Sequence, residues 1–144
     1  MSHAYIWEAE NAHEFAKGLN CLNNEILGCT QCISCKVFES GNHPDTIYVT
    51  GTKPSSIGVD DVREQIILPM ATKPFRYKYK VFIVENAETL TPQAQNALLK
   101  TIEEPAPYGV FLFVCKHVHN FLPTLMSRCV RKRGGNKEIT AISS

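Results

Sequence analysis

The stretch that decides the fold runs from Lys80 to Pro105 and reads Lys-Val-Phe-Ile-Val-Glu-Asn-Ala-Glu-Thr-Leu-Thr-Pro-Gln-Ala-Gln-Asn-Ala-Leu-Leu-Lys-Thr-Ile-Glu-Glu-Pro. Its apolar run at 81–84 has no polar alternation, which is typical of a parallel strand covered by helices on both faces. Thr91 and Pro92 fit the N-cap and the first position of a helix, which must end before Pro105. The stretch therefore predicts a buried strand, a short turn and a capped helix.

The end of this strand carries the first functional signal. Nucleotide-hydrolysing proteins place an Asp-Glu pair at such a strand end, the Asp for magnesium and the Glu for the attacking water, whereas this chain has Glu85-Asn86. An amide cannot take a proton from water. A phosphate loop, Gly-x-x-x-x-Gly-Lys-Ser/Thr, is also missing between Trp7 and Phe15, where the sequence has no glycine and three carboxylates. We therefore expect no ATP binding and no cofactor-binding residues.

The rest of the chain alternates between strand-like and helix-like segments. Strands are expected at 4–7, 46–50, 81–84 and 110–115, and helices at 11–20, 59–67, 92–104 and 119–126. Pro69 is expected to stop the second of these helices. Such alternation predicts an α/β layered domain with a mainly parallel sheet. Periodicity is lost from Val130 onward, so residues 130–144 are expected to form an irregular, frayed tail.

Composition narrows the class of protein. The chain has 144 residues, 44% of them hydrophobic and 20% charged, which suits one soluble globular domain. Its net charge of +1 gives no bulk attraction to nucleic acid or membrane. No apolar run of about 18 residues and no secretory signal is present. We expect a cytoplasmic protein without a membrane partner.

The cysteines are unevenly placed. Four of the six fall within residues 21–35, namely Cys21, Cys29, Cys32 and Cys35. Two-residue gaps let neighbouring thiolates reach one ion, and four thiolates surround Zn²⁺ tetrahedrally without leaving an open position. The pattern predicts a structural zinc site. Free or partly oxidised thiols, or a redox Cys-x-x-Cys, are the alternatives, although a redox pair does not account for Cys21.

Two groups of basic residues can contact phosphates, but each can equally be an ordinary solvated surface feature. Arg128, in Ser-Arg-Cys, can reach a phosphate on a neighbouring subunit, although a single surface arginine is usually just solvated. The basic run at 128–133 can touch a phosphate backbone, but such clusters are commonly solvated as well. The segment 73–80 is a basic, aromatic connector ahead of the strand at 81–84.

Together these motifs resemble the N-terminal domain of bacterial clamp-loader subunits, the AAA+ proteins of the DNA polymerase III holoenzyme. The resemblance is carried by the cysteine cluster, by the run from Ala94 to Pro105 and by the run from Leu122 to Cys129. It implies a three-layer sheet of the P-loop NTPase type at 1–129 with an inserted four-cysteine zinc module at about 21–35. The chain departs from the family in having no lid or collar domain after Cys129, so we expect the isolated chain to be a monomer.

Within that family the chain is most similar to the delta-prime subunit, with the gamma/tau motors as close relatives. The resemblance implies a subunit that is no enzyme by itself but a component of the DNA-directed DNA polymerase holoenzyme. Such a subunit supplies Arg128 as an arginine finger in trans to the ATP site of a neighbour. The implied partners are the other loader subunits and, through the complex, the sliding clamp and primer-template DNA.

Two alternatives stay open at this stage. One is a motor-type gamma/tau ATPase whose phosphate loop is missing from this chain only, which Glu85-Asn86 argues against. The other is a zinc-dependent nucleic-acid-binding module unrelated to loaders. That module would require tight DNA binding with a steep salt dependence.

Overall fold

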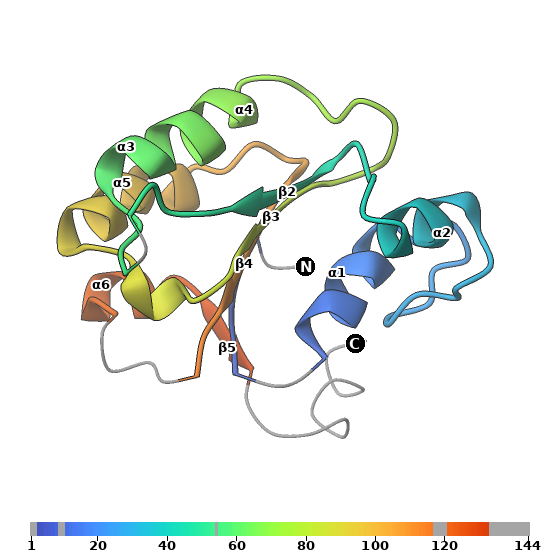
Figure 1. Ribbon diagram of the computed structural model, residues 1–144, viewed down its shortest axis with the longest axis horizontal. Coiled ribbons are helices and arrows are strands. Elements are labelled where there is room, and N and C mark those ends of the chain that lie inside the picture. Colours follow the sequence, from blue (N-terminus) through green and yellow to red (C-terminus); the bar gives the residue numbers. More distant parts are fainter. Residues whose placement is uncertain (1–2, 9–10, 54, 117–120, 133–144) are drawn as a thin grey trace.

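A computed structural model of the chain describes residues 3–8, 11–53, 55–116 and 121–132. Its centre is a five-stranded parallel sheet with the strand order β2-β3-β4-β1-β5 (Figure 1). The strands are β1 (Ala4–Trp7), β2 (Thr46–Val49), β3 (Lys80–Val84), β4 (Gly109–Val114) and β5 (Val130–Lys132). The predicted α/β class with a mainly parallel sheet is confirmed, in a form consistent with the P-loop type.

The helices cover both faces of the sheet. They are α1 (Ala12–Leu19), α2 (Ile33–Glu39), α3 (Val59–Val62), the π-helical turn η1 (Arg63–Ile67), α4 (Leu68–Met70), the 3₁₀ turn η2 (Ala87–Thr89), α5 (Pro92–Glu103) and α6 (Pro123–Met126). One apolar cluster packs α3, α5 and α6 against the sheet, and a second packs α1 against the other face (Figure 1). This sandwich explains why β3 and β4 are apolar at successive positions rather than at alternate ones.

Helix α5 forms as its sequence predicts. The Thr91 hydroxyl accepts a hydrogen bond from the Ala94 N–H at 3.1 Å, and Pro92 takes the first helical position. The buried Gln95 side chain ties α5 to the start of α6, because its Oε1 accepts from the Leu122 N–H at 2.7 Å. The segment leading to Arg128 is thereby fixed to the core.

Two expectations need correction. Residues Val130–Lys132 are not part of a frayed tail but form β5, whose register places Val130 opposite Tyr5 and Lys132 opposite Trp7. Three residues, two of them basic, at a sheet edge carry no apolar pattern, so their pairing with β1 left no local signal. The remainder of the predicted tail, 133–144, lies outside the described residues.

The second correction concerns Pro69. The helix does not stop before it but continues to Met70, since a π-helical turn over Arg63–Ile67 precedes it. Pro69 is thus the penultimate residue of a helical run that ends at Met70. Among the described residues, no helix is long and apolar enough to span a membrane.

Candidate metal centre and nucleotide edge

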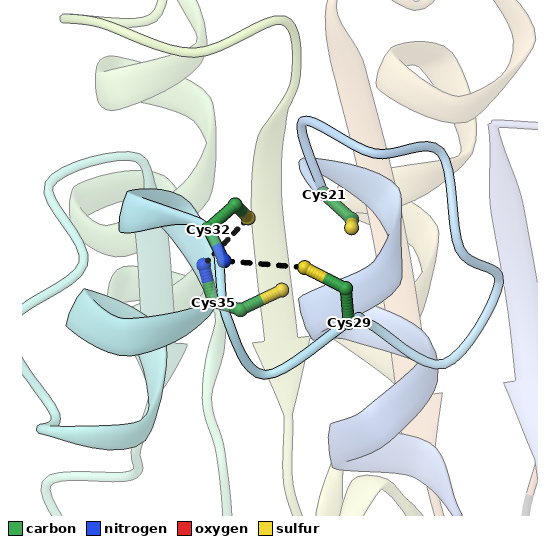
Figure 2. Close-up of side chains that lie close together, drawn as sticks. All are labelled: Cys21, Cys29, Cys32 and Cys35. Carbon is green, nitrogen blue, oxygen red and sulfur yellow. Dashed lines mark hydrogen bonds between the residues drawn. The ribbon is translucent and has the colours of Figure 1, made fainter.

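The four clustered cysteines converge on one point. Their Sγ atoms all lie within 4.8 Å of one another, and none forms a disulfide (Figure 2). Tetrahedral zinc with Zn–S bonds of about 2.3 Å separates its sulfurs by about 3.8 Å. A contraction of about an ångström or less therefore brings the four donors to coordination distance. The structure thus gathers the four residues that the spacing predicted, in a geometry compatible with structural zinc.

Backbone N–H groups support these sulfurs. Cys32 is the N-cap of α2, and its N–H and that of Gln31 donate to Cys29 Sγ at 3.2 and 3.4 Å. The N–H groups of Cys35 and Leu22 donate in turn to Cys32 Sγ at 3.4 and 3.5 Å. Donors aimed at sulfur stabilise the thiolate, which is the form that binds metal.

The protonation of the cluster is uneven. The N–H groups of Cys32 and Gln31 lower the pKa of the Cys29 thiol to about 6, whereas burial raises the pKa of Cys35 to about 12. Burial raises the pKa of Cys32, but the donors from Cys35 and Leu22 outweigh it, so the net direction is down. A cation at this point favours the charged form of all four sulfurs, and its binding releases the proton of Cys35.

The cysteine segment is packed tightly on α1. A Cβ built on Gly18 would lie 1.7 Å from the Ile26 carbonyl oxygen, so only glycine permits this approach. Lys17, almost fully buried, pairs with Glu39 on α2 at 2.9 Å and thereby joins the two helices that flank the cluster. The module that spans residues 21–35 is therefore part of the folded domain rather than a loose appendage.

The carboxyl edge of the sheet is where a parallel α/β domain binds ligands. Here this edge is crossed by two ion pairs, each at 2.8 Å: Glu8, after β1, with Arg131, and Glu85, after β3, with His13 of α1. The His13 ring also lies 5.9 Å from the Tyr48 ring, in a stacked arrangement. Polar side chains that already contact one another thus stand beside the β1–α1 connection, of which residues 9 and 10 lie outside the described chain.

The structure adds a backbone reason for Asn86. This residue has φ 52°, in the left-handed region that asparagine tolerates better than most residues. Its carbonyl oxygen accepts from the Thr89 hydroxyl at 2.7 Å as the short η2 turn begins. Sequence reasoning about catalysis did not foresee this role, for which the only signal was asparagine before a turn.

Arg128 follows α6 on the surface. Its Nε lies 2.5 Å from a carboxylate oxygen of Glu103 at the end of α5, and its Nη1 donates to the Thr124 carbonyl at 3.0 Å. The side chain remains 39% exposed. The other described members of the basic run are Arg131, which pairs with Glu8, and Lys132 in β5.

The fold and the site first define a class, a parallel α/β domain of P-loop type that carries a four-cysteine cluster. The family follows from comparison: residues 1–133 match the family described as "DNA polymerase III, delta subunit", and the chain belongs to it. This result confirms the resemblance to the N-terminal domain of clamp-loader subunits.

Individual relatives are of two kinds. The chain is 34% identical over 136 residues to DNA polymerase III subunit gamma/tau of Mycoplasma pneumoniae, covering 90% of this chain and 20% of the relative. It is 44% identical over 102 residues to subunit delta' of Yersinia pestis, covering 70% and 30%. It is 31% identical over 137 residues to subunit delta' of Bacillus subtilis, covering 90% and 41%. The chain therefore spans a fifth to two fifths of the length of these proteins.

A solved structure is similar as well. The gamma subunit-related protein of DNA polymerase III from Thermotoga maritima has a TM-score of 0.64 and 25% identity, and the match covers 91% of this chain and 40% of that one. Almost all of the present chain thus has the fold found in part of that protein.

Proposed function

We propose that this chain is a domain of a non-hydrolysing, delta-prime-type clamp-loader subunit, which works through contacts with its partners rather than through turnover of its own. The observation that carries the proposal is the carboxyl edge of the sheet. Glu8 is paired with Arg131 and Glu85 contacts His13, so both carboxylates are already engaged within the chain, and no glycine precedes α1 to present backbone amides to a phosphate. A triphosphate at this edge would have to displace Glu8 from Arg131 before it could use that cation.

The Glu85-Asn86 strand end supports the same conclusion. Glu85 is engaged by His13, and the amide of Asn86 cannot accept a proton from water. A water molecule beside Asn86 would meet an amide where nucleotide-hydrolysing proteins place the carboxylate base. A motor-type gamma/tau function is the second candidate, and the 34% identity to a gamma/tau relative favours it.

Arg128 supplies the function that remains under this proposal. In the loader we expect it to leave Glu103 and to reach the γ-phosphate bound by a neighbouring motor subunit, where a cation stabilises the developing charge. Both side chains of the pair with Glu103 are more than a third exposed, so little free energy opposes this exchange. The zinc module at 21–35 then has a structural role, with Zn²⁺ bound by Cys21, Cys29, Cys32 and Cys35. The proposed partners are the other loader subunits, the sliding clamp and primer-template DNA, and the isolated chain is expected to be a monomer.

The test is DNA-stimulated ATP turnover of a loader reconstituted from the full subunit and candidate motor subunits. Arg128→Ala is expected to lower turnover at the adjoining site by about 10³–10⁵, the range for arginine fingers. Glu103→Gln is the matched control, because it releases Arg128 without removing it and should preserve turnover. Unchanged turnover in Arg128→Ala would remove this residue from the mechanism. Saturable micromolar binding of ATP and magnesium to the present chain would favour the motor-type candidate instead.

A further inference from the structure

The loop between α4 and β3 is a second exposed feature, to which the proposed function gives no role. We call residues Lys73–Tyr79 the basic connector. Its cationic side chains, Lys73, Arg76 and Lys78, are exposed, and Phe75 between them is 84% exposed, the highest value among the large apolar side chains described. The loop thus presents an exposed aromatic ring with cationic side chains on both sides of it in the sequence.

Two buried side chains fix the backbone of the basic connector through hydrogen bonds. The Asp45 carboxylate, itself buried, accepts hydrogen bonds from the backbone N–H groups of Phe75, Arg76 and Tyr77, the last two at 2.9 and 2.7 Å. The Asn20 side chain forms two hydrogen bonds with the backbone of Tyr79. Its Oδ1 accepts from the Tyr79 N–H at 2.8 Å, and its Nδ2 donates to the Tyr79 carbonyl at 2.9 Å. The connector is thus an ordered platform, and its conformation does not depend on the outward side chains.

The cations of this platform are free to act on a ligand. In the part of the chain that the structure describes, none of Lys73, Arg76 and Lys78 forms an ion pair. Arg76 lies over the Tyr77 ring at 5.9 Å and Lys78 over the Tyr79 ring at 5.2 Å, contacts that orient the two cations without neutralising them. Although the whole chain has a net charge of only +1, three cationic side chains gather on this loop, and the one carboxylate bonded to it, that of Asp45, is buried and contacts its backbone.

The three aromatic rings of the basic connector differ in how much of each is exposed to a ligand. Tyr77 packs against His43 with ring centroids 4.6 Å apart, and Tyr77 and Tyr79 are both only partly exposed. Phe75 has no ring partner among the described contacts, so its faces are open to a planar ligand. The platform therefore offers one free aromatic face between positive charges.

We propose that the basic connector is a contact surface for single-stranded nucleic acid, with a base stacked on Phe75 and the backbone phosphates on Lys73, Arg76 and Lys78. A single strand presents an unpaired π-face and an anionic backbone together, and stacking on aromatics along a basic track is how sequence-tolerant binding is achieved. An acidic protein segment satisfies the cations but leaves the exposed ring unused. A duplex satisfies the phosphate contacts but keeps its bases stacked on one another.

This surface is independent of the proposed arginine finger. Figure 1 shows the loop between α4 and β3 at the upper right of the view, far from α6 and the start of β5, between which Arg128 lies. The connector is instead fastened next to the cysteine module, since Asn20 directly precedes Cys21 in the sequence. Failure of one proposal therefore leaves the other standing.

The test is binding of a fluorescent oligothymidine to the full chain, followed by anisotropy over a range of salt concentrations. Each phosphate contact on a single strand contributes about −0.7 to the slope of log K against log salt, so three cations predict a slope of about −2. The triple variant Lys73→Gln, Arg76→Gln, Lys78→Gln should lose most of this slope. Phe75→Ala should bind about tenfold more weakly with the slope unchanged, because it removes a stacked base and no charge.

A matched triple variant controls for net charge. Lys53→Gln, Arg63→Gln, Lys100→Gln removes three exposed cations from other surfaces and should bind oligothymidine as the parent does. Circular dichroism and zinc content should stay unchanged in every variant, because Asp45 and Asn20 bind only backbone atoms of the connector.

Three results would overturn the proposal. Equal losses in the two triple variants would indicate a general charge effect. A Phe75→Ala variant that binds as tightly as the parent would remove the stacked base. Polyglutamate that competes as well as oligothymidine at equal charge would indicate an acidic protein partner instead.

Discussion

The contact between Gly18 and the cysteine module gives the sharpest test of how that module is held. A Cβ at residue 18 would sit 1.7 Å from the Ile26 carbonyl oxygen, half the 3.4 Å at which ordinary contact begins. The obstacle is backbone and cannot rotate away as a side chain can. Gly18→Ala must therefore push the segment around Ile26 off α1.

Two opposing contributions decide whether Gly18→Ala raises or lowers the free energy of unfolding. In an unobstructed helix, replacing glycine with alanine stabilises by about 1 kcal/mol. Forcing an additional carbon into a packed contact typically costs about 1–3 kcal/mol, and a contact this short lies at the upper end. We therefore expect net destabilisation. If the strain falls wholly on the cysteine module, about 1–3 kcal/mol corresponds to zinc affinity weakened by about 5- to 150-fold.

The assay is competition for zinc with a chromophoric chelator, preceded by metal analysis that should find one zinc per chain. Gly58→Ala is the matched control, because its added Cβ meets only Asp61 Oδ2 at 3.9 Å and its φ of −93° suits alanine. That variant should bind zinc as the parent does. If Gly18→Ala binds zinc equally well and melts no earlier, then the module does not rest on α1 as described. A parent chain with well under one zinc would refute the site itself.

Two further outcomes follow from local chemistry. In metal-free protein at neutral pH, Cys29, with a pKa of about 6, should react with iodoacetamide long before Cys115 and Cys129, whose pKa values burial raises to about 12. At pH values below 12, the reaction of Cys115 and Cys129 should become about tenfold faster for each unit by which the pH is raised. Bound zinc should protect Cys29 from the reagent. Mass spectrometry of the labelled peptides measures both effects. Thr91→Ala should lower the free energy of unfolding by about 1 kcal/mol in urea titrations, because the Ala94 N–H loses its acceptor. No loss would mean that water replaces the cap.

Local patterns predicted the elements that bury apolar surface. Strand β3 and the cap of α5 follow from short stretches whose residues all favour the same structure, and the four cysteines follow from spacing alone. The same reasoning missed β5, because Val130–Lys132 becomes a strand only when the edge of β1 is there to pair with it. It also predicted that the helix stops at Pro69, since no residue pattern in the sequence indicates the π-helical turn before this proline.

Contacts between distant residues were the least predictable part of the site. Asp45 reads as an ordinary turn residue after Pro44, yet its carboxylate organises a loop whose first bonded N–H lies 30 residues later. Glu103 likewise reads as the end of a helix, while the fold makes it the partner of Arg128. Such pairings depend on the tertiary arrangement of helices and loops, so no local sequence pattern predicts them.

Helix α1 is fixed to the sheet by contacts within the chain itself. Phe15 stacks on Trp7 at 4.6 Å and meets Tyr5 edge-on at 5.2 Å, so buried aromatic contacts fix the helix to β1. Aromatic pairs contribute about 0.5–1.5 kcal/mol each beyond the burial of their area. The contact of His13 with Glu85 at 2.8 Å adds a polar link between this helix and the end of β3. None of these contacts involves Arg128, so the proposed arginine finger does not depend on the residues that fix α1 to the sheet.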